Sequence, residues 1–404
     1  MMLITLAWKN IWRNRLRSLI IICAIAVGLT CGLVVAGFYS NIGDQIINST
    51  IDTQISHMQI SDPRFLLDNE IKYYVPDAQS AVRKIDSLPQ VIAAAPRIVI
   101  NAMAASAQTA IGVQINGVIP EDEKRLTTIS QLVVEGRYFE EGVVNSAVIG
   151  MELARKLDLE LGMRIVLTFT DENGAITGSA FRISGLYRTA SSAFDRSMVY
   201  VRAGELGPLL APEIRFQQIA VRFTDIKAAD TSVNQIKALF SGMEVRTWRE
   251  ISPMLDYMSF AMSMVMYALL AIILFALSFG IVNTMLMVVL ERRREFGMLM
   301  AVGMKRMTLF LLVVSETIAL SLTGAAAGMT AALVLLAALG RTGIDLGMFS
   351  EGMREFGIAE VLYPSVPWVM YPGLAAMVIL AAVISAVYPA LMALKLKPAE
   401  AMRG

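Results

Sequence analysis

The stretch that decides the fold is Met262–Leu290, which reads MSMVMYALLAIILFALSFGIVNTMLMVVL and contains no charged residue. The segment Glu291-Arg-Arg-Arg-Glu-Phe-Gly-Met-Leu-Met-Ala-Val-Gly-Met304 follows it directly. A helix needs about 20 apolar residues to cross about 30 Å of hydrocarbon, and this run would be roughly 43 Å long. We therefore expect residues 256–290 to form a membrane span with a stalk that projects beyond the membrane. A tilted span is the alternative.

Three further stretches resemble this one. Residues 18–43 and 361–394 carry no charge, and residues 307–340 contain only Glu316. The chain of 404 residues is 56% hydrophobic and 17% charged, whereas soluble domains carry about 25% charged residues. The first run exceeds the core of a signal peptide, so we interpret it as an uncleaved anchor. The sequence predicts four spans, at residues 18–40, 256–290, 307–339 and 369–394.

Basic residues fix the expected orientation, because loops rich in Lys and Arg stay in the cytoplasm. They precede the first span, cluster in residues 291–306 and return in the tail, residues 395–404. Trp and basic residues within residues 1–17 indicate an amphipathic helix on the inner leaflet, with a simple basic anchor as the alternative. We expect a multi-pass protein of the inner membrane with both termini in the cytoplasm.

The remaining segments are expected outside, as a loop at residues 340–368 and a large domain at residues 41–255. Between Asn41 and Phe260 there are 21 basic and 26 acidic side chains, so the expected periplasmic domain is mildly acidic. Its hydrophobic patterns predict an α+β fold. The expected strands are Ile98–Ala105, Ala110–Val118, Arg164–Thr170, Ser179–Leu186, Gln217–Phe223 and Met243–Arg246, and the expected helices are Val148–Leu161, ended by Gly162, and one near Ala228–Phe240.

The inventory of reactive residues is small. His57 is the only histidine, and Cys23 and Cys31 are about 12 Å apart along a helix, too far to form a disulfide. The 404 residues contain neither a G-x-S-x-G nucleophile elbow nor a G-x-x-x-x-G-K-[ST] phosphate loop. The net charge of +1 does not indicate a basic surface for binding nucleic acid. We expect no catalytic, metal-binding or cofactor-binding residue on this chain, although an exported Ser/Lys or carboxylate enzyme stays open.

The segment after the second span has the composition of a short docking helix. Apolar side chains would insert into a groove of a partner, and charged side chains would fix the register. The expected apolar face holds Phe296, Leu299 and Met300, and the charged face holds Glu291, Arg294 and Glu295.

This segment resembles the E-x-x-x-E-x-G-x-L-x-A-x-G motif of ABC-transporter permeases of the MacB/LolC/FtsX superfamily, where it forms the coupling helix. Trp8–Ser18 is similar to the membrane-surface helix of that family, and Tyr388–Arg403 is similar to its closing Y-P-A and P-x-E-A-[LM]-R motifs. Val148–Leu157 and Phe181–Gly185 resemble parts of its periplasmic domain. The resemblance covers essentially the whole chain.

The resemblance implies a non-catalytic permease subunit with four transmembrane helices and a MacB-like periplasmic α+β domain. It implies a dimer with a second copy or a paralogue, two separate ABC ATPase subunits that bind ATP and Mg²⁺, and a periplasmic carrier or adaptor. Residues that contact the client stay unknown. The residues expected to couple to the ATPase are Glu291, Arg292, Arg294, Glu295, Phe296, Gly297, Leu299, Ala301 and Gly303.

The size of the outside domain and the lack of an ATP site in the sequence look most like LolC and LolE, the lipoprotein-releasing permeases. Lipoprotein release from the cytoplasmic membrane is therefore the expected function. The alternatives are MacB-like efflux with an adaptor and an outer-membrane channel, and FtsX-like mechanical transmission without transport. Glu316 is expected to meet a polar partner within the helix bundle rather than to serve as a substrate or proton site.

Overall fold

The computed structural model describes residues 15–139, 142–349, 352, 361–366, 368 and 370–395. The chain divides into two units, and each is described by itself. One contains residues 1–43, 260–345 and 361–404, and the other contains residues 44–259 and 346–360. The expected surface helix up to residue 14, residues 353–360 of the expected loop and residues 396–404 of the tail lie outside the described residues.

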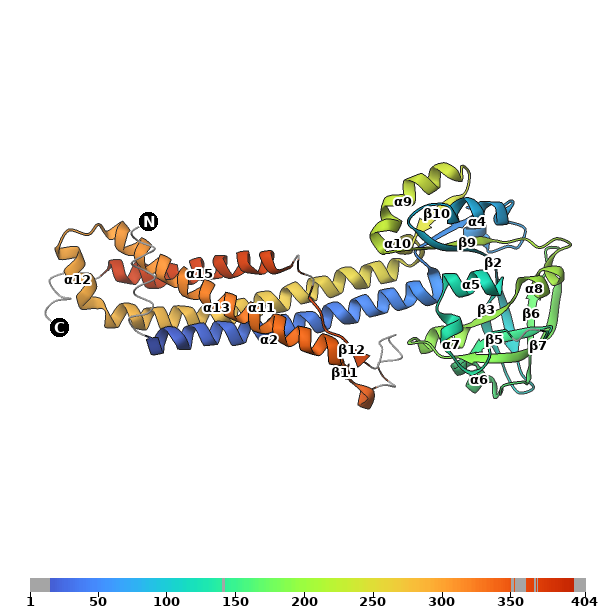
Figure 1. Ribbon diagram of the computed structural model, residues 1–404, viewed down its shortest axis with the longest axis horizontal. Helices are drawn as coiled ribbons and strands as arrows, with labels where there is room; N and C mark the ends of the chain where they lie inside the picture. Colours follow the sequence, from blue (N-terminus) through green and yellow to red (C-terminus); the bar gives the residue numbers. More distant parts are fainter. Residues whose placement is uncertain are drawn as a thin grey trace. The chain divides into compact units, whose positions relative to one another are not determined.

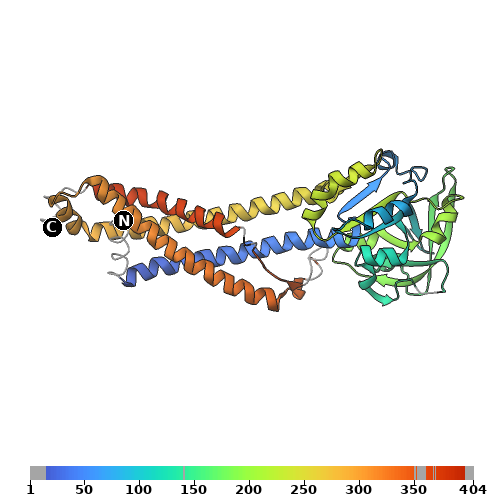
Figure 2. The same cartoon turned by 45° about the horizontal axis from the view of Figure 1, so that its top comes forward.

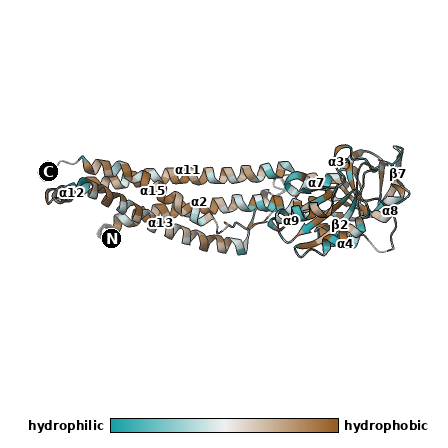
Figure 3. Cartoon of the chain, turned by 90° about the horizontal axis from the view of Figure 1, so that it is seen from above, coloured by the Kyte–Doolittle hydropathy of each residue, from teal (hydrophilic) through white to brown (hydrophobic). Residues whose placement is uncertain are grey.

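The first unit is a bundle of long helices (Figure 1), whose residues are mostly hydrophobic (Figure 3). All four have the length and composition needed to cross a membrane, so the four long apolar helices that the sequence predicted are present. The described part of the unit also holds a short helix and a two-stranded antiparallel sheet. The elements are α2 (Arg15–Thr50) and α11 (Pro253–Glu291), each of which runs into the second unit, and α12 (Arg293–Ala301), α13 (Arg306–Thr342), β11 (Ile344–Asp345), β12 (Val361–Leu362) and α15 (Met370–Leu394).

Small residues bring α2 and α13 into close contact. A Cβ atom on Gly328 would lie 2.7 Å from the carbonyl oxygen of Ala26, and one on Gly324 would lie 2.9 Å from Cβ of Ile25. The hydroxyl of Thr30 donates to the carbonyl of Gly328 at 3.1 Å across this contact. Backbone approach of this kind, with an interhelical hydrogen bond, replaces the hydrophobic effect that is missing inside a bilayer.

The second unit is built on a mixed sheet in the order β10-β1-β9-β2-β3-β8-β5-β7-β4, with β6 paired to β2 and β7. Two pairs are parallel, β3 with β8 and β5 with β7, and the remaining pairs are antiparallel. The strands are β1 (Met58–Ser61), β2 (Val91–Ala105), β3 (Ala110–Val118), β4 (Val133–Gly136), β5 (Ser146–Gly150), β6 (Arg164–Thr170), β7 (Ile176–Tyr187), β8 (Met198–Arg202), β9 (Gln218–Phe223) and β10 (Glu244–Thr247).

Short helices surround this sheet (Figure 2). Of these, α4 and α5 contact β2, α8 contacts β3, and α9 contacts β10. Buried aliphatic and aromatic side chains from the strands form the main core. The helices around the sheet are η1 (Ile51–Ile55), α3 (Phe65–Asp68), α4 (Ala78–Asp86), α5 (Pro120–Leu126), η2 (Ile129–Gln131), α6 (Met151–Leu157), α7 (Ser192–Ser197), α8 (Ala203–Leu210), α9 (Ile226–Leu239) and α10 (Trp248–Ile251), and η3 (Gly347–Phe349) is assigned to the same unit.

The predicted α+β fold is confirmed, with one local correction. The sequence predicted a helix at Val148–Leu161, but residues Ser146–Gly150 form the buried strand β5 and only Met151–Leu157 is helical. The helix ends where Asp158 adopts a left-handed conformation with φ 53°, so Gly162 does not cap it. Gly162, with φ 86°, instead forms part of the turn before β6.

Candidate functional site

The predicted coupling segment forms its own helix between two membrane helices. Only Arg292 separates the end of α11 from the start of α12, and its amide still donates to the carbonyl of Val288 at 3.1 Å. At the other end, Gly303 has φ 106°, a conformation that favours glycine. The amide of Met304 then donates to the carbonyl of Leu299 at 3.0 Å, so the chain turns sharply into α13.

Arg292 ties this turn to α13. Its Nε donates to Glu295 at 3.0 Å, and a terminal nitrogen lies 3.2 Å and 3.1 Å from the two carboxylate oxygens of Glu316. Its guanidinium also lies 5.1 Å from the ring centre of Phe296. Glu316 is only 5% exposed, so its charge is compensated within the chain. The expectation that Glu316 meets a polar partner is confirmed, although sequence reasoning missed that Arg292 is this partner.

The apolar face of α12 points into the chain's own bundle, which corrects the expected docking geometry. Phe296 is 1% exposed and belongs to a core that includes Leu309, Leu312 and Ala393. Leu299 and Met300 are partly buried against the same core. An amphipathic helix buries its apolar stripe on the nearest apolar surface, and here that surface is intramolecular. Phe296 therefore cannot be the side chain that inserts into a partner.

The outer face of α12 and the following turn carries both charged and apolar side chains. Met298 is 55% exposed and Val302 is 84% exposed, and neither was singled out from the sequence. Exposed apolar residues among charges have the chemistry of a protein-docking face. Glu295 is half exposed and Gly297 is buried. The other predicted coupling residues that are exposed are Glu291, Arg294, Ala301 and Gly303.

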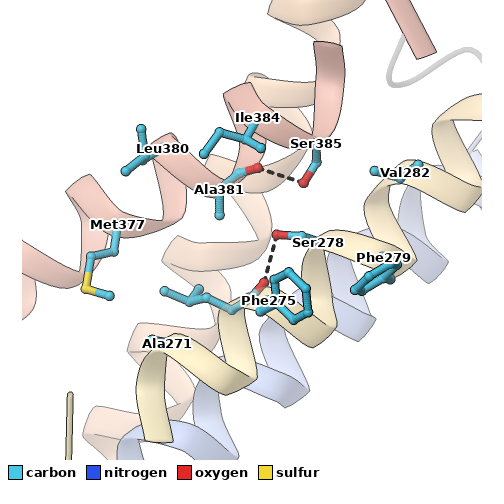
Figure 4. Close-up of a pocket in the computed structure, with 11 residues that line it drawn as sticks. Ala271, Phe275, Ser278, Phe279, Val282, Met377, Leu380, Ala381, Ile384 and Ser385 are labelled. Atoms are coloured by element: carbon cyan, nitrogen blue, oxygen red, sulfur yellow. Dashed lines mark hydrogen bonds between the residues drawn. The ribbon is translucent and has the colours of Figure 1, made fainter. Parts of the chain in front are cut away.

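An open apolar groove of about 370 Å³ lies between α11 and α15 (Figure 4). Two hydroxyls, from Ser278 and Ser385, point into it. Each donates to a carbonyl of its own helix, that of Leu274 at 2.8 Å and that of Ala381 at 2.7 Å. The remaining wall is aliphatic or aromatic, including Phe275. The groove therefore suits hydrocarbon rather than a polar solute.

The search for a metal or catalytic site covers the described residues outside α12. Among the described residues, no three His, Cys, Asp or Glu side chains are placed to hold a metal ion. His57 is buried, and its Nδ1 accepts a hydrogen bond from the amide of Phe223 at 3.3 Å. This ring therefore has a structural contact in the sheet domain. The segment around α12 is therefore the candidate functional site.

Comparison with known families decides the identity of the chain. Residues 18–239 match the MacB-like periplasmic core domain, and residues 267–398 match the C-terminal part of FtsX-like permeases. The chain is an ABC-transporter permease of the MacB/LolC/FtsX superfamily. Both matched segments occupy the regions that the sequence motifs had indicated.

Individual relatives of this permease are distant. The lipoprotein-releasing system transmembrane protein LolC of Neisseria meningitidis is 21% identical over 300 residues, covering 71% of this chain and 69% of LolC. The macrolide export ATP-binding/permease protein MacB of Brucella abortus is 28% identical over 204 residues, covering 46% of this chain and 32% of MacB. This permease thus spans about a third to two thirds of the curated relatives it matches. The crystal structure of the periplasmic region of MacB from Actinobacillus actinomycetemcomitans is 13% identical, covers 52% of this chain and 97% of its own, and gives a TM-score of 0.36.

Proposed function

We propose that this permease carries ATP-driven motion from separate ATPase subunits to its sheet domain, and that this motion releases lipoproteins from the cytoplasmic membrane. The placement of α12 carries the proposal. The helix joins α11 to α13, its inner face is fixed to the bundle, and its outer face exposes Met298 and Val302. A partner that grips the outer face would therefore move the attached membrane helices as well.

The ion pairs of Arg292 support the proposal that motion of α12 is transmitted to α13. Arg292 contacts Glu295 on α12 and Glu316 on α13, and Phe296 anchors α12 in the bundle core. A displacement of α12 alone would break both ion pairs and expose Phe296. Because burying a large apolar side chain contributes about 1.5–3 kcal/mol, α12 and α13 should move together.

The lipoprotein client rests on the match to LolC, which extends over 71% of this chain. The proposed topology places both termini and α12 in the cytoplasm and the sheet domain in the periplasm, in agreement with the basic residues around α12. The proposed assembly contains two ATPase subunits and a second permease copy or paralogue, with ATP and Mg²⁺ on the ATPase. MacB-like efflux with an adaptor is the second candidate, because the periplasmic match bears the MacB name and MacB itself is a relative.

The decisive experiment changes the outer face of α12. Val302→Asp places a charge at an 84% exposed apolar position without touching the bundle core. We expect it to weaken capture of the ATPase that co-purifies with the tagged full-length chain about tenfold, or about 1.4 kcal/mol. Val144→Asp is the matched control, because Val144 is 76% exposed in the sheet unit. Equal ATPase recovery with both variants would rule out α12 as the docking site.

A further inference from the structure

The first membrane helix enters the sheet domain without a loop. Helix α2 continues into η1, whose π-helical turn is closed by a hydrogen bond from the amide of Ser56 to the carbonyl of Ile51 at 2.9 Å. The next amide, that of His57, already pairs with the carbonyl of Val221 on β9 at 3.1 Å. Only Ser56 and His57 lie between η1 and β1. Short π-helical turns of this kind are frequent at functional sites.

Ser56 is held in an unfavourable conformation. Its backbone has φ 59° and ψ −177°, a region that is essentially restricted to glycine. Its side chain is 1% exposed, and its hydroxyl lacks a hydrogen-bond partner among the described residues. Such strain persists only where the surroundings fix the chain on both sides. The connection between helix and sheet is therefore rigidly determined by its neighbours.

Those neighbours donate hydrogen bonds to successive carbonyls of η1. Four consecutive carbonyl oxygens, from residue 52 to residue 55, each accept a hydrogen bond from a different part of the sheet domain. The donors are the amide of Thr128 to Asp52 at 3.1 Å, the hydroxyl of Tyr200 to Thr53 at 3.4 Å, the guanidinium of Arg97 to Gln54 at 3.0 Å, and the side-chain amide of Gln59 to Ile55 at 2.9 Å.

Arg97 is the most firmly held of these donors. It forms a two-pronged ion pair with Glu123 of α5, with distances of 3.0 Å and 2.7 Å. Glu123 also accepts the hydroxyl of Thr127 at 2.9 Å. The side chains of Arg97 and Glu123 are 3% and 1% exposed. An apolar pair often stabilises a core as well as a buried ion pair does. The ion pair with Glu123 is therefore important here because it orients Arg97, whose other terminal nitrogen donates to the carbonyl of Gln54.

Hydrogen bonds hold η1 where packing does not. A cavity of about 220 Å³ lies beside it, and Gln54, Arg97, Tyr200 and Arg246 contribute to the wall. Gln54 and Ile55 line this cavity from η1. The hydrogen bonds to their carbonyls, led by that of Arg97, hold η1 on the side that faces it.

We propose that Arg97 and Glu123 form a clamp that fixes η1, and with it the end of α2 that belongs to the second unit, to the sheet. Arg97 is a positioning residue in this role. The inference rests on the proposed function, because a clamp matters for transport only if α2 is driven by the ATPase. It names Arg97 and Glu123 as the residues through which motion of α2 would reach the sheet.

The test measures how firmly α2 is held to the sheet in the full-length chain. Spin labels are placed at Asn48 on α2 and at Asn173 in the β6–β7 hairpin, both exposed, with Cys23 and Cys31 replaced by Ser. The clamp variant is Arg97→Met with Glu123→Leu, which removes both charges. Arg97→Lys is a second variant: its ammonium keeps a cation beside Glu123 but lacks the second nitrogen that donates to Gln54, so it should fold even if the clamp variant does not.

The matched control is Glu121→Gln with Lys124→Met, which removes an exposed ion pair of 2.9 Å on the same helix. A second label pair, Asn173 with Lys237, reports whether the sheet domain itself is intact. We expect one narrow Asn48–Asn173 distance in the wild type and in the control. Both the clamp variant and Arg97→Lys should lose this single distance and show a broad distribution, while the Asn173–Lys237 distance stays unchanged.

The effect of nucleotide on the label distance distinguishes failure of the clamp from failure of the proposed function. In complex with the co-purifying ATPase, ATP with vanadate should shift the Asn48–Asn173 distance in the two variants but not in the wild type. If the variants broaden the distribution but nucleotide shifts nothing, the clamp stands and the ATP-driven role is wrong. If Arg97→Lys or the clamp variant folds and keeps the narrow wild-type distance, the clamp itself is overturned.

Discussion

At the scale of single residues, His57 shows how the sheet domain depends on one neutral ring. Its Nδ1 accepts the amide of Phe223, and only an unprotonated nitrogen can accept. Burial lowers the pKa of His57 below its ordinary value of 6.5. The carboxylates of Asp52 and Asp225 oppose this shift, and the guanidinium of Arg222 adds to it.

This arrangement predicts a specific pH dependence. As the pH falls, the unfolded chain binds a proton on His57 before the folded chain does, so the free energy of unfolding decreases below about pH 6.5 and is at its full value above it. Chemical unfolding of the full-length chain between about pH 8 and about pH 5 measures this. His57→Gln, which keeps an acceptor that does not titrate, should depend less on pH. Identical pH profiles for wild type and variant would contradict the prediction.

Single residues also mark the limit of what the sequence could predict at the site. An ionisable group inside a span must find a partner, so the need of Glu316 for one was predictable. The identity of Arg292 was not, because the two residues meet only through the packing of the α11–α12 turn on α13. The periodicity of α12 likewise showed an apolar stripe but not that its own bundle would cover Phe296.

At the scale of elements, the pair of Arg292 and Glu316 joins the α11–α12 turn to α13. Arg292→Ala would leave the carboxylate of Glu316, which is 5% exposed, without its cation. We expect a loss of about 3–5 kcal/mol in stability, seen as a lower unfolding temperature in detergent. The double variant Arg292→Met with Glu316→Leu leaves no buried charge and should recover most of this loss. A double variant as unstable as Arg292→Ala would show that the charges themselves stabilise the turn.

The sequence predicted some helices and strands more accurately than others. The strands β3 and β6 have the predicted bounds, and in β6 buried and exposed residues alternate as a half-buried strand requires. The strand β5 is buried at every position, so its residues have no alternation and merged with the helix that follows. Apolar runs that are buried on all sides cannot be divided into strand and helix by periodicity alone.

At the scale of the whole molecule, the four spans could be predicted because hydrocarbon excludes charge over about 20 residues. The order of strands in the sheet could not, since it depends on contacts between distant segments. Orientation in the membrane is a prediction that labelling can check. A single Cys at Asn173, with Cys23 and Cys31 removed, should react with an impermeant thiol reagent in spheroplasts before lysis.

Asn173 is chosen because Asp171 is needed for the turn: its carboxylate accepts the amides of Asn173 and Ala175 at 2.9 Å and 2.8 Å. A Cys at Lys305, which is exposed next to α12, is the control and should react only after lysis. The reverse pattern would invert the proposed topology.

The position of β1 in the sheet has a consequence for how the protein is made. Met58 is paired with Val221 on one side and with Thr247 on the other, so the first strand of the domain lies between two strands that are synthesised near its end. Pairings this distant in sequence form slowly. A growing chain that has inserted its first helix into the bilayer must therefore keep β1 unpaired while the rest of the domain is translated. Biogenesis chaperones should accordingly bind nascent chains that stop before Thr247 and release those that extend past it.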